Sequence, residues 1–406
     1  MSLQHLVEQR LREASCLHSH VDVVAIGKAS REMAAAVQSI LGDNVLRRLI
    51  VSDDADAVLD LESTIGQHPV PGEGSLAAGR QLVAFLDTPS RAVCTIFLLS
   101  GGASSLCVLP APPLQLDDLR RVWMAALESG LDITALNKIR ALCSEIAGGA
   151  ILHHVQTDRS ISLIMVDNVI SGAPWVASAL TYDYQPTSQD VATLMTEIGL
   201  SATALGDKIL EACSHRRVGM SIPVRTSHEN LTVAEPSMLH GHSVLEAQRL
   251  GYRVVDMGSR VRGDVRAVTR AWSQIIKEEL HHNDAFCLVG VGEVTVQVRG
   301  SGRGGRCQEF SLSMCDALES VERDFGFTAR ASDGRDFLFG VGGAWVDNST
   351  KARAIALGIN WSAAIDSNDS FQPLSALKQL LDGGHTGWNL CDLYVACFKG
   401  PTRPRR

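Results

Sequence analysis

Residues 93–105 read VCTIFLLSGGASS, an apolar segment that ends in two glycines flanked by serines. Such a run, closed by a glycine turn, is typical of a parallel strand that is buried on both faces. Three further segments of the first half share this character, at 21–26, 48–51 and 161–166. Amphipathic stretches alternate with them, at 30–41, 74–85, 116–127 and 137–151. This alternation predicts an α/β fold, with a doubly wound sheet that carries helices on both faces.

The second half of the chain predicts another α/β unit. Helical patterns are found at 237–250, 264–282 and 308–322, and strand patterns at 252–256, 285–289 and 293–299, the last of them alternating as in a half-exposed strand. The 406 residues exceed the roughly 150 that one domain usually contains. We place the boundary within the ambiguous stretch 186–227, which gives domains 1–217 and 218–406.

Composition narrows the class of protein. The net charge of -8 argues against a nucleic-acid partner. No apolar run reaches the roughly 20 residues of a membrane span, so no membrane partner is expected. The ten cysteines contain no C-x-x-C and lie mostly in apolar runs, which predicts buried free thiols and a cytoplasmic protein. The sequence leaves a homodimer open.

Two loops of the first half have the chemistry of an anion site. Lys28 brings a cation to the start of the helix 30–41, where the helix dipole disfavours it, and this indicates a bound anion; the alternative is a solvated lysine. The loop is not a phosphate-binding P-loop, because Asp22 and Ala29 occupy positions where that motif needs glycine and a hydroxyl residue. The segment 100–105 could form a nest of backbone N–H groups for phosphate, or a plain turn with a capping serine.

Two loops of the second half are also candidates. The glycine-rich segment 300–306 carries two arginines before a helix and could wrap phosphate oxygens. Its formal G-x-G-x-x-G match is weak, because Glu322 falls within a predicted helix and not at the end of a strand. Asp333 and Asp336 flank a glycine and could hold Mg²⁺ or act as a base, although a solvated turn fits equally. His68 is interpreted as structural.

In this order, the loops resemble the glycerate 2-kinase family, whose C-terminal part is called the MOFRL domain. The resemblance extends over most of the chain and rests on several segments together. These are G-K-A at 27–29, H-P-x-P at 68–71, S-G-G-x-S at 100–104, N-x-x-R at 137–140, R-G-x-G-R-G-G-R-x-Q-E-F at 299–310, N-D-S at 368–370 and T-G-x-N-x-x-D-L at 386–393.

The resemblance implies ATP-dependent phosphorylation of D-glycerate at its 2-hydroxyl, with Mg²⁺, in a cleft between an N-terminal Rossmann-like domain and the MOFRL domain. It implies that Lys28 and Arg306 are catalytic cations, that Asp333 is a base or a metal ligand, and that Asp167 is a second candidate metal ligand. The substrate or nucleotide contacts that it implies are Ser100, Gly101, Gly102, Ser104, Asn137, Arg140, Gly302, Arg303, Gly304, Gly305 and Asn389.

The chain departs from the family pattern at acidic positions. The segment 166–171 reads VDNVIS and lacks the second acid of the family's S-D-V-x-G-D, and 333–340 reads DGRDFLFG and lacks a later acid. Fewer carboxylates weaken Mg²⁺ binding, so an impaired relative that only binds ligands is one alternative. An NAD(P)H enzyme like hydroxypyruvate reductase, a label that the family has also carried, is another.

Overall fold

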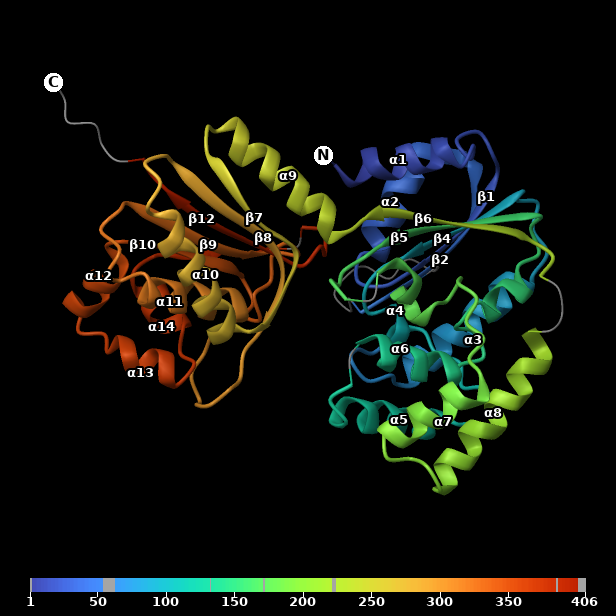
Figure 1. Cartoon of the computed structure of the whole chain (residues 1–406). Helices are drawn as coiled ribbons and strands as arrows, with labels where there is room; N and C mark the ends of the chain where they lie inside the picture. The colour runs from blue at the N-terminus through green and yellow to red at the C-terminus, as the bar shows by residue number, and fades with distance from the viewer. Residues whose placement is uncertain are drawn as a thin grey trace. The chain divides into compact units, whose positions relative to one another are not determined.

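The computed structural model describes residues 2–53, 63–131, 133–170, 172–220, 224–384 and 386–400. They form two compact units. The first unit is Met1–Val166 together with Ile170–Ala234, and the second is Asp167–Val169 together with Glu235–Arg406. Each unit contains one six-stranded sheet. Each also has its own helices (Figure 1). The prediction of an α/β fold with two domains is confirmed.

The first unit is built on a fully parallel sheet. Its strands are β1 (Val21–Ile26), β2 (Val45–Ser52), β3 (Ser63–Ile65), β4 (Cys94–Leu99), β5 (Arg159–Met165) and β6 (Ser227–Ala234). They lie in the order β3-β2-β1-β4-β5-β6, which is the strand order of the doubly wound nucleotide-binding fold. Every residue of β1 and β4 is buried, as the continuous apolar runs predict.

Helices cover both faces of this sheet. Those of the first unit are α1 (Leu3–Glu13), α2 (Ser30–Leu41), α3 (Glu73–Asp87), α4 (Ala103–Leu106), α5 (Leu116–Glu128), α6 (Ile133–Leu142), α7 (Ser188–Glu197) and α8 (Ala204–Met220), with short 3-10 helices at Gly42–Asn44, Ala150–His154 and Ala173–Ser178. Helices α1 and α2 lie on one face, and α3 and α4 lie on the other (Figure 1). A second apolar cluster joins α5 to α8.

The sheet of the second unit is mixed. Its strands are β7 (Arg253–Asp264), β8 (Phe286–Thr295), β9 (Phe325–Ala331), β10 (Val341–Asp347), β11 (Leu380–Asp382) and β12 (Asp392–Phe398), in the order β11-β10-β9-β12-β8-β7. Among the described strands of this sheet, only β7 and β8 pair in parallel, and the other pairs are antiparallel. The helices are α9 (Pro236–Arg249), α10 (Val265–Glu279), α11 (Arg306–Ala317), α12 (Thr350–Ala356), α13 (Trp361–Asp366) and α14 (Phe371–Ala376).

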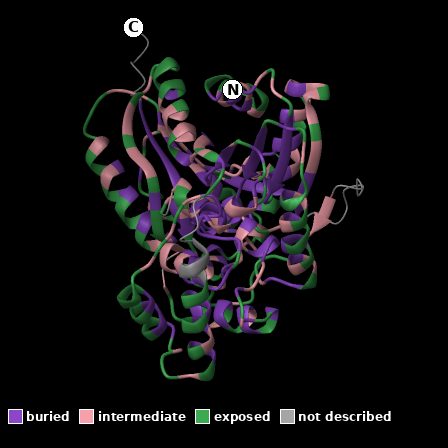
Figure 2. Cartoon of the chain, turned by 90° about the vertical axis from the view of Figure 1, so that its right-hand side faces the viewer, coloured by how far each residue is buried: buried purple, intermediate pink, exposed green. Residues whose placement is uncertain are grey.

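The core of the second unit lies on one face of its sheet, beneath α10 and α11 (Figure 1). Trp272, Phe310, Phe327 and Tyr394 meet there edge to face, with ring centroids 4.9–6.3 Å apart. Helix α9 contacts β7 and β8 on the other side. Figure 2 shows how buried residues concentrate in the strands while exposed residues line the outer faces of the helices.

Strand β6 changes the domain boundary that the sequence suggested. The expected boundary was residue 217, but β6 pairs with β5 in the first sheet, from Ser227 beside Arg159 to Ala234 beside Met165. The first unit therefore extends to Ala234. The strand was hard to recognise because its first half is an alternating, partly exposed edge and not a buried apolar run.

Two predicted elements are shorter than expected. The helix predicted for 137–151 ends at Leu142: Ser144 bridges to Pro110, and Gly148 and Gly149, with positive φ angles of 57° and 85°, turn the chain further on. The strand predicted for 293–299 is only the last part of β8, which ends at Thr295. All ten cysteines are free thiols, as predicted. Among the described residues, no helix is both long and apolar enough to cross a membrane.

Candidate functional site

The loops after β1 and β4 are joined to each other. These strands are neighbours at the point where the strand order reverses, which is where doubly wound folds bind ligands. Lys28 N donates to Gly101 O (2.9 Å), and Ala29 N donates to Ser100 Oγ (3.1 Å). Gly27 has a φ of +130°, and a Cβ there would lie 2.7 Å from Ser100 O. The N–H groups of Lys28 and Ala29 are therefore hydrogen-bonded to the second loop. The part of the first loop that remains available to contact an anion is the Lys28 side chain.

The side chain of Lys28 is exposed and forms no ion pair within the described ranges. It lies beside Gly102, where a Cβ would be 3.3 Å from both Lys28 Cγ and His68 Cδ2. Desolvation, followed by the positive charge of Lys28, lowers the pKa of His68 to about 4. His68 is therefore neutral at physiological pH and is part of this site. The interpretation of His68 as merely structural missed this position.

A chain of hydrogen bonds links the serine loop to α6. The Ser178 hydroxyl donates to Asn137 Oδ1 (3.2 Å) and hydrogen-bonds to Ser104 Oγ at 2.7 Å. Ser178 is held in place by an uncommon backbone: Ala177, Ser178 and Ala179 all have left-handed φ angles, between 54° and 58°. Such angles cost roughly 1–2 kcal/mol each for residues other than glycine, and they concentrate at functional sites.

Arg140 lies one helical turn beyond Asn137 on α6. Its guanidinium is 5.3 Å from the centre of the Trp123 ring, and its Nε is buried without a hydrogen-bond partner. Burial lowers the pKa of Arg140 to about 10, so it keeps its charge at neutral pH. The first unit thus brings together all the site residues that the resemblance implied for it: Lys28, Ser100, Gly101, Gly102, Ser104, Asn137 and Arg140.

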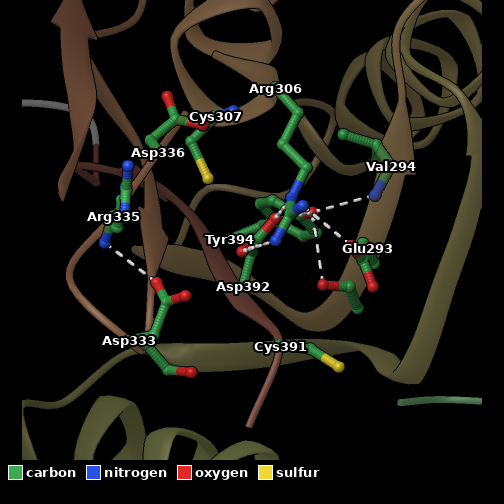
Figure 3. Close-up of polar contacts among 12 residues, drawn as sticks. Glu293, Val294, Arg306, Cys307, Asp333, Arg335, Asp336, Cys391, Asp392 and Tyr394 are labelled. Atoms are coloured by element: carbon green, nitrogen blue, oxygen red, sulfur yellow. Dashed lines mark hydrogen bonds and ion pairs between the residues drawn. The ribbon is translucent and has the colours of Figure 1, made fainter. Parts of the chain in front are cut away.

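In the second unit, Arg306 is held between two carboxylates (Figure 3). Its Nε and one terminal nitrogen bind Asp392 at 2.6 and 3.0 Å, and the other terminal nitrogen lies 2.7 Å from Glu293. Burial alone would lower the pKa of Arg306, but the hydrogen bonds and charge of Asp392, with Glu293, raise it overall. Tyr394 donates to Asp392 Oδ2 (3.0 Å) and fixes that carboxylate from its other side.

The glycines before Arg306 allow close packing. A Cβ on Gly300, Gly302 or Gly304 would lie within 2.6 Å of the segment 367–370, and one on Gly305 would lie 2.3 Å from Asp336. Hydrogen bonds fix the same contact: Arg299 N donates to Asn368 Oδ1 (2.6 Å) and Arg303 N to Asp369 Oδ1 (3.1 Å). Arg303 is exposed, with its guanidinium 5.0 Å from the Phe371 ring. The loop is held by these contacts, and its glycines serve packing.

The two acids that flank Gly334 have different roles. Asp336 is buried and accepts hydrogen bonds from Cys307 N (3.0 Å) and Gln308 N (2.9 Å), so it caps the start of α11. Desolvation raises its pKa despite these bonds. Asp333 is half-buried and accepts from Arg335 N (2.8 Å) in a local turn. Only Asp333 is placed where its carboxylate could meet a ligand.

Asp167 and Asn389 meet in the second unit. Asn389 Nδ2 donates to Asp167 Oδ2 (3.4 Å), and Cys391 Sγ donates to the Asp167 carbonyl (3.3 Å). Asp333 does not join them in a metal centre: the residues that the structure describes contain no group of three or more His, Cys, Asp and Glu that could hold an ion. Mg²⁺ is, however, usually bound by one or two carboxylates together with substrate phosphates, and single carboxylates of this kind fit that arrangement.

Comparison with known proteins decides the family. A family model described as "Domain of unknown function (DUF4147)" matches residues 2–213, and the model of the MOFRL family matches residues 286–392. The chain belongs to the glycerate kinase family. It is 27% identical to the D-glycerate 2-kinase of Thermotoga maritima, over 92% of this chain and 90% of the relative. It is 29% identical to a putative hydroxypyruvate reductase of Agrobacterium vitis, over 91% of this chain and 85% of the relative.

A solved structure supports the same assignment. The crystal structure of glycerate kinase from Thermotoga maritima matches this glycerate kinase family member with a TM-score of 0.84 and 26% identity, over 98% of this chain and 95% of that chain. Three site features were missed from the sequence: the place of His68, the contacts of Ser178, and the two carboxylates on Arg306. The T-G-x-N-x-x-D-L segment did contain Asp392, but nothing in its spacing indicated that Arg306 is its partner.

Proposed function

We propose that this chain transfers a phosphoryl group from ATP to the 2-hydroxyl of D-glycerate. The names of its relatives support the reaction, and one observation of the site carries it. In the first unit, Lys28 and Arg140 form no ion pair with any described carboxylate, although they stand beside a loop of serines and glycines. Cations that lack acidic partners form a site for a small anion.

Each candidate residue then has a role. Lys28 neutralises charge that develops on the phosphoryl group, as cations do in phosphotransferases. The N–H groups of Gly101 and Gly102 make no hydrogen bond within the described residues and add donors for an anion. Ser100 and Asn137 hold the loop and its partners in position. Arg303, exposed and without an ion pair in the described part of the chain, is proposed to contact nucleotide phosphates, on a loop formed by Gly302, Gly304 and Gly305.

Arg306 can offer a ligand only part of its hydrogen-bonding capacity. A guanidinium has five N–H donors, and Asp392 and Glu293 engage three of them in the described structure. We propose that the remaining donors face the substrate or nucleotide, and that the two carboxylates fix their direction. Asp333 is proposed as the acceptor of the hydroxyl proton, and Asp167, next to Asn389, as a single carboxylate for Mg²⁺, which would bring the nucleotide phosphates together with the protein.

The relatives named as putative hydroxypyruvate reductases make a dinucleotide enzyme the second candidate. The strand order of the first unit is compatible with it. A dinucleotide, however, places its pyrophosphate against free N–H groups at the start of the first helix. Here the N–H groups of Lys28 and Ala29 are bound to Gly101 O and Ser100 Oγ. This favours the kinase.

The kinase is tested by ADP release with D-glycerate and Mg·ATP, beside NADH oxidation with hydroxypyruvate. Lys28→Ala should lower kcat/KM by about 100-fold or more, the usual effect of removing one charge-stabilising donor. Its melting temperature should not change, because Lys28 is exposed and unpaired within the described residues. Lys277→Ala, at an exposed lysine of α10, is the control and should leave kcat/KM unchanged. NADH oxidation without ADP release would contradict the kinase proposal and support a reductase. Ligand binding without either activity would indicate an impaired relative.

A further inference from the structure

The positive charge of Arg140 has no carboxylate partner among the described residues. Its Nε is buried without a hydrogen-bond partner, and no carboxylate of the described ranges pairs with it. Its charge meets only the face of Trp123, at 5.3 Å. A cation that is largely removed from water costs several kcal/mol unless an anion compensates it. No residue in the described part of the chain supplies that anion.

A small cavity adjoins Arg140. Its volume is about 20 Å³, enough for roughly one water molecule or one oxygen of a ligand. Ser104, Ser144 and Ser178 line it together with Arg140, and the remaining lining residues are apolar or aromatic. Ser144 Oγ accepts from Ile146 N (3.3 Å) and Ala147 N (3.2 Å), which leaves its own hydroxyl hydrogen to donate. No residue that lines the cavity is acidic.

The described groups near the cavity are mostly cationic or neutral, and Asp53 is an acid that also acts on His68. Lys28 and Arg140 are both close enough to His68 to lower its pKa, and His68 is neutral near pH 7. The hydrogen bonds of Ser178 to Ser104 and Asn137 fix the hydroxyl that lines the cavity. Ser104 and Ser178 therefore fix the wall of the cavity through their own hydrogen bonds, and Arg140 and the Ser144 hydroxyl are left to donate to a ligand.

We propose that Arg140, with the Ser144 hydroxyl, binds the carboxylate of the substrate and so makes this protein selective for small 2-hydroxy acids. This inference rests on the proposed function and deepens it. A planar guanidinium matches a planar carboxylate through two parallel hydrogen bonds. A carboxylate carries a single charge, which one arginine balances, whereas a phosphate carries more charge than one arginine balances. Arg306 is a poor alternative, since two carboxylates of the protein already occupy it.

The test is isothermal titration of the full chain, without nucleotide, with D-glycerate and with its uncharged amide, D-glyceramide. The natural protein should bind D-glycerate about 10- to 100-fold more tightly than the amide, as expected for a hydrogen bond to a charged group. Arg140→Gln should bind D-glycerate more weakly than the natural protein by that same factor. It should bind D-glycerate and D-glyceramide with equal affinity. The KM for ATP should change less than about threefold, since the proposal gives Arg140 no contact with the nucleotide.

Two controls keep the outcome clear. Arg121→Gln, at an exposed arginine of α5, should bind both ligands like the natural protein. Arg140→Lys keeps the charge if Arg140→Gln does not fold, and should still prefer D-glycerate, but more weakly. The proposal is overturned if the natural protein binds the amide and the acid equally or binds neither of them. It is also overturned if Arg140→Gln raises the KM for ATP and leaves D-glycerate binding unchanged. If the protein binds glycerate selectively but releases no ADP, the proposed carboxylate site is supported and the proposed kinase activity is contradicted.

Discussion

Arg306 and Arg140 show that an arginine's partners decide its role. Arg306 is bound by Asp392, which is 1% exposed, and by Glu293, whereas Arg140 has no acidic partner in the described part of the chain. A buried ion pair adds little net stability, but removing one partner leaves the other charge buried and uncompensated. Arg306 therefore supports the fold of the second unit whatever it does for the reaction.

Arg306→Ala should lower the free energy of unfolding by about 3 kcal/mol, the low end for broken buried pairs, because the Arg306 side chain is 34% exposed. Arg303→Ala, at the exposed arginine of the same loop, should change it by less than about 1 kcal/mol, the value of an exposed cation–π contact such as the one with Phe371. Both are measured by urea unfolding. Adding Asp392→Asn to Arg306→Ala should restore part of the loss, since no buried charge remains. If the double variant lost the sum of the free-energy changes of the two single variants, Arg306 and Asp392 would not be energetically coupled.

His68 predicts a pH dependence of stability. Desolvation, then Lys28 and Arg140, lower its pKa to about 4, while Asp53 opposes them, and the ordinary value is 6.5. Between pH 6.5 and 4 the unfolded chain binds the proton and the folded chain does not, so this contribution to stability is full above pH 6.5 and is lost as the pH falls toward 4.

The measurement compares urea unfolding of the natural protein and His68→Gln from pH 7.5 to 4. Their difference in free energy of unfolding should shift in favour of His68→Gln as the pH falls. The difference is needed because burial lowers the pKa values of His153 and His228 as well. Parallel curves across this range would show that His68 titrates alike in both states.

At the scale of elements, the loop 299–305 is defined by what it packs against. Its glycines touch the 367–370 turn and Asp336, and the same turn hydrogen-bonds the loop through Asn368 and Asp369. A glycine in such a place is needed because there is no room for a Cβ, and not because it binds phosphate. The two explanations make different predictions for stability.

Gly302→Ala would place a Cβ 2.5–2.6 Å from backbone and Cβ atoms of Asp369, where backbone must move. Its free energy of unfolding should fall by about 1–3 kcal/mol, the range for overpacking. Gly241 lies in the middle of α9, and a Cβ there would have nothing within 4 Å. Gly241→Ala should therefore raise the free energy of unfolding by about 1 kcal/mol, because alanine has the higher helix propensity. Urea unfolding followed by tryptophan fluorescence measures both. An unchanged stability of Gly302→Ala together with lost activity would favour a ligand contact over packing.

For the whole molecule, the sequence was informative where a local pattern determines the structure. Buried parallel strands such as β4 are continuous apolar runs, and Gly27 and Gly102 marked the turns at the ligand end of the first sheet. Asp392, the buried partner of Arg306, lies 86 residues away in the chain, so no local spacing could reveal it. The left-handed turn at Ser178 contains no glycine, and it gave no signal either.

Strand β6 is the largest feature that the sequence pattern missed, and it allows a test of the domain boundary. It completes the first sheet beside β5, Arg10 Nε of α1 donates to Thr232 O (2.8 Å), and His228 Nδ1 lies 2.8 Å from Ser160 Oγ. A fragment that stops at residue 217 would lose these contacts and expose the N–H and C=O groups of β5, an edge that invites aggregation.

The fragment 1–234 should therefore be monomeric and resistant to limited proteolysis, whereas 1–217 should aggregate or be digested rapidly. Size-exclusion chromatography and a trypsin time course measure both properties on the two purified fragments. Arg10→Ala in fragment 1–234 is an intermediate case, because it removes one bond to β6 while the strand stays paired. Equal solubility and equal protection of 1–217 and 1–234 would mean that β6 is dispensable and that the first unit ends before it.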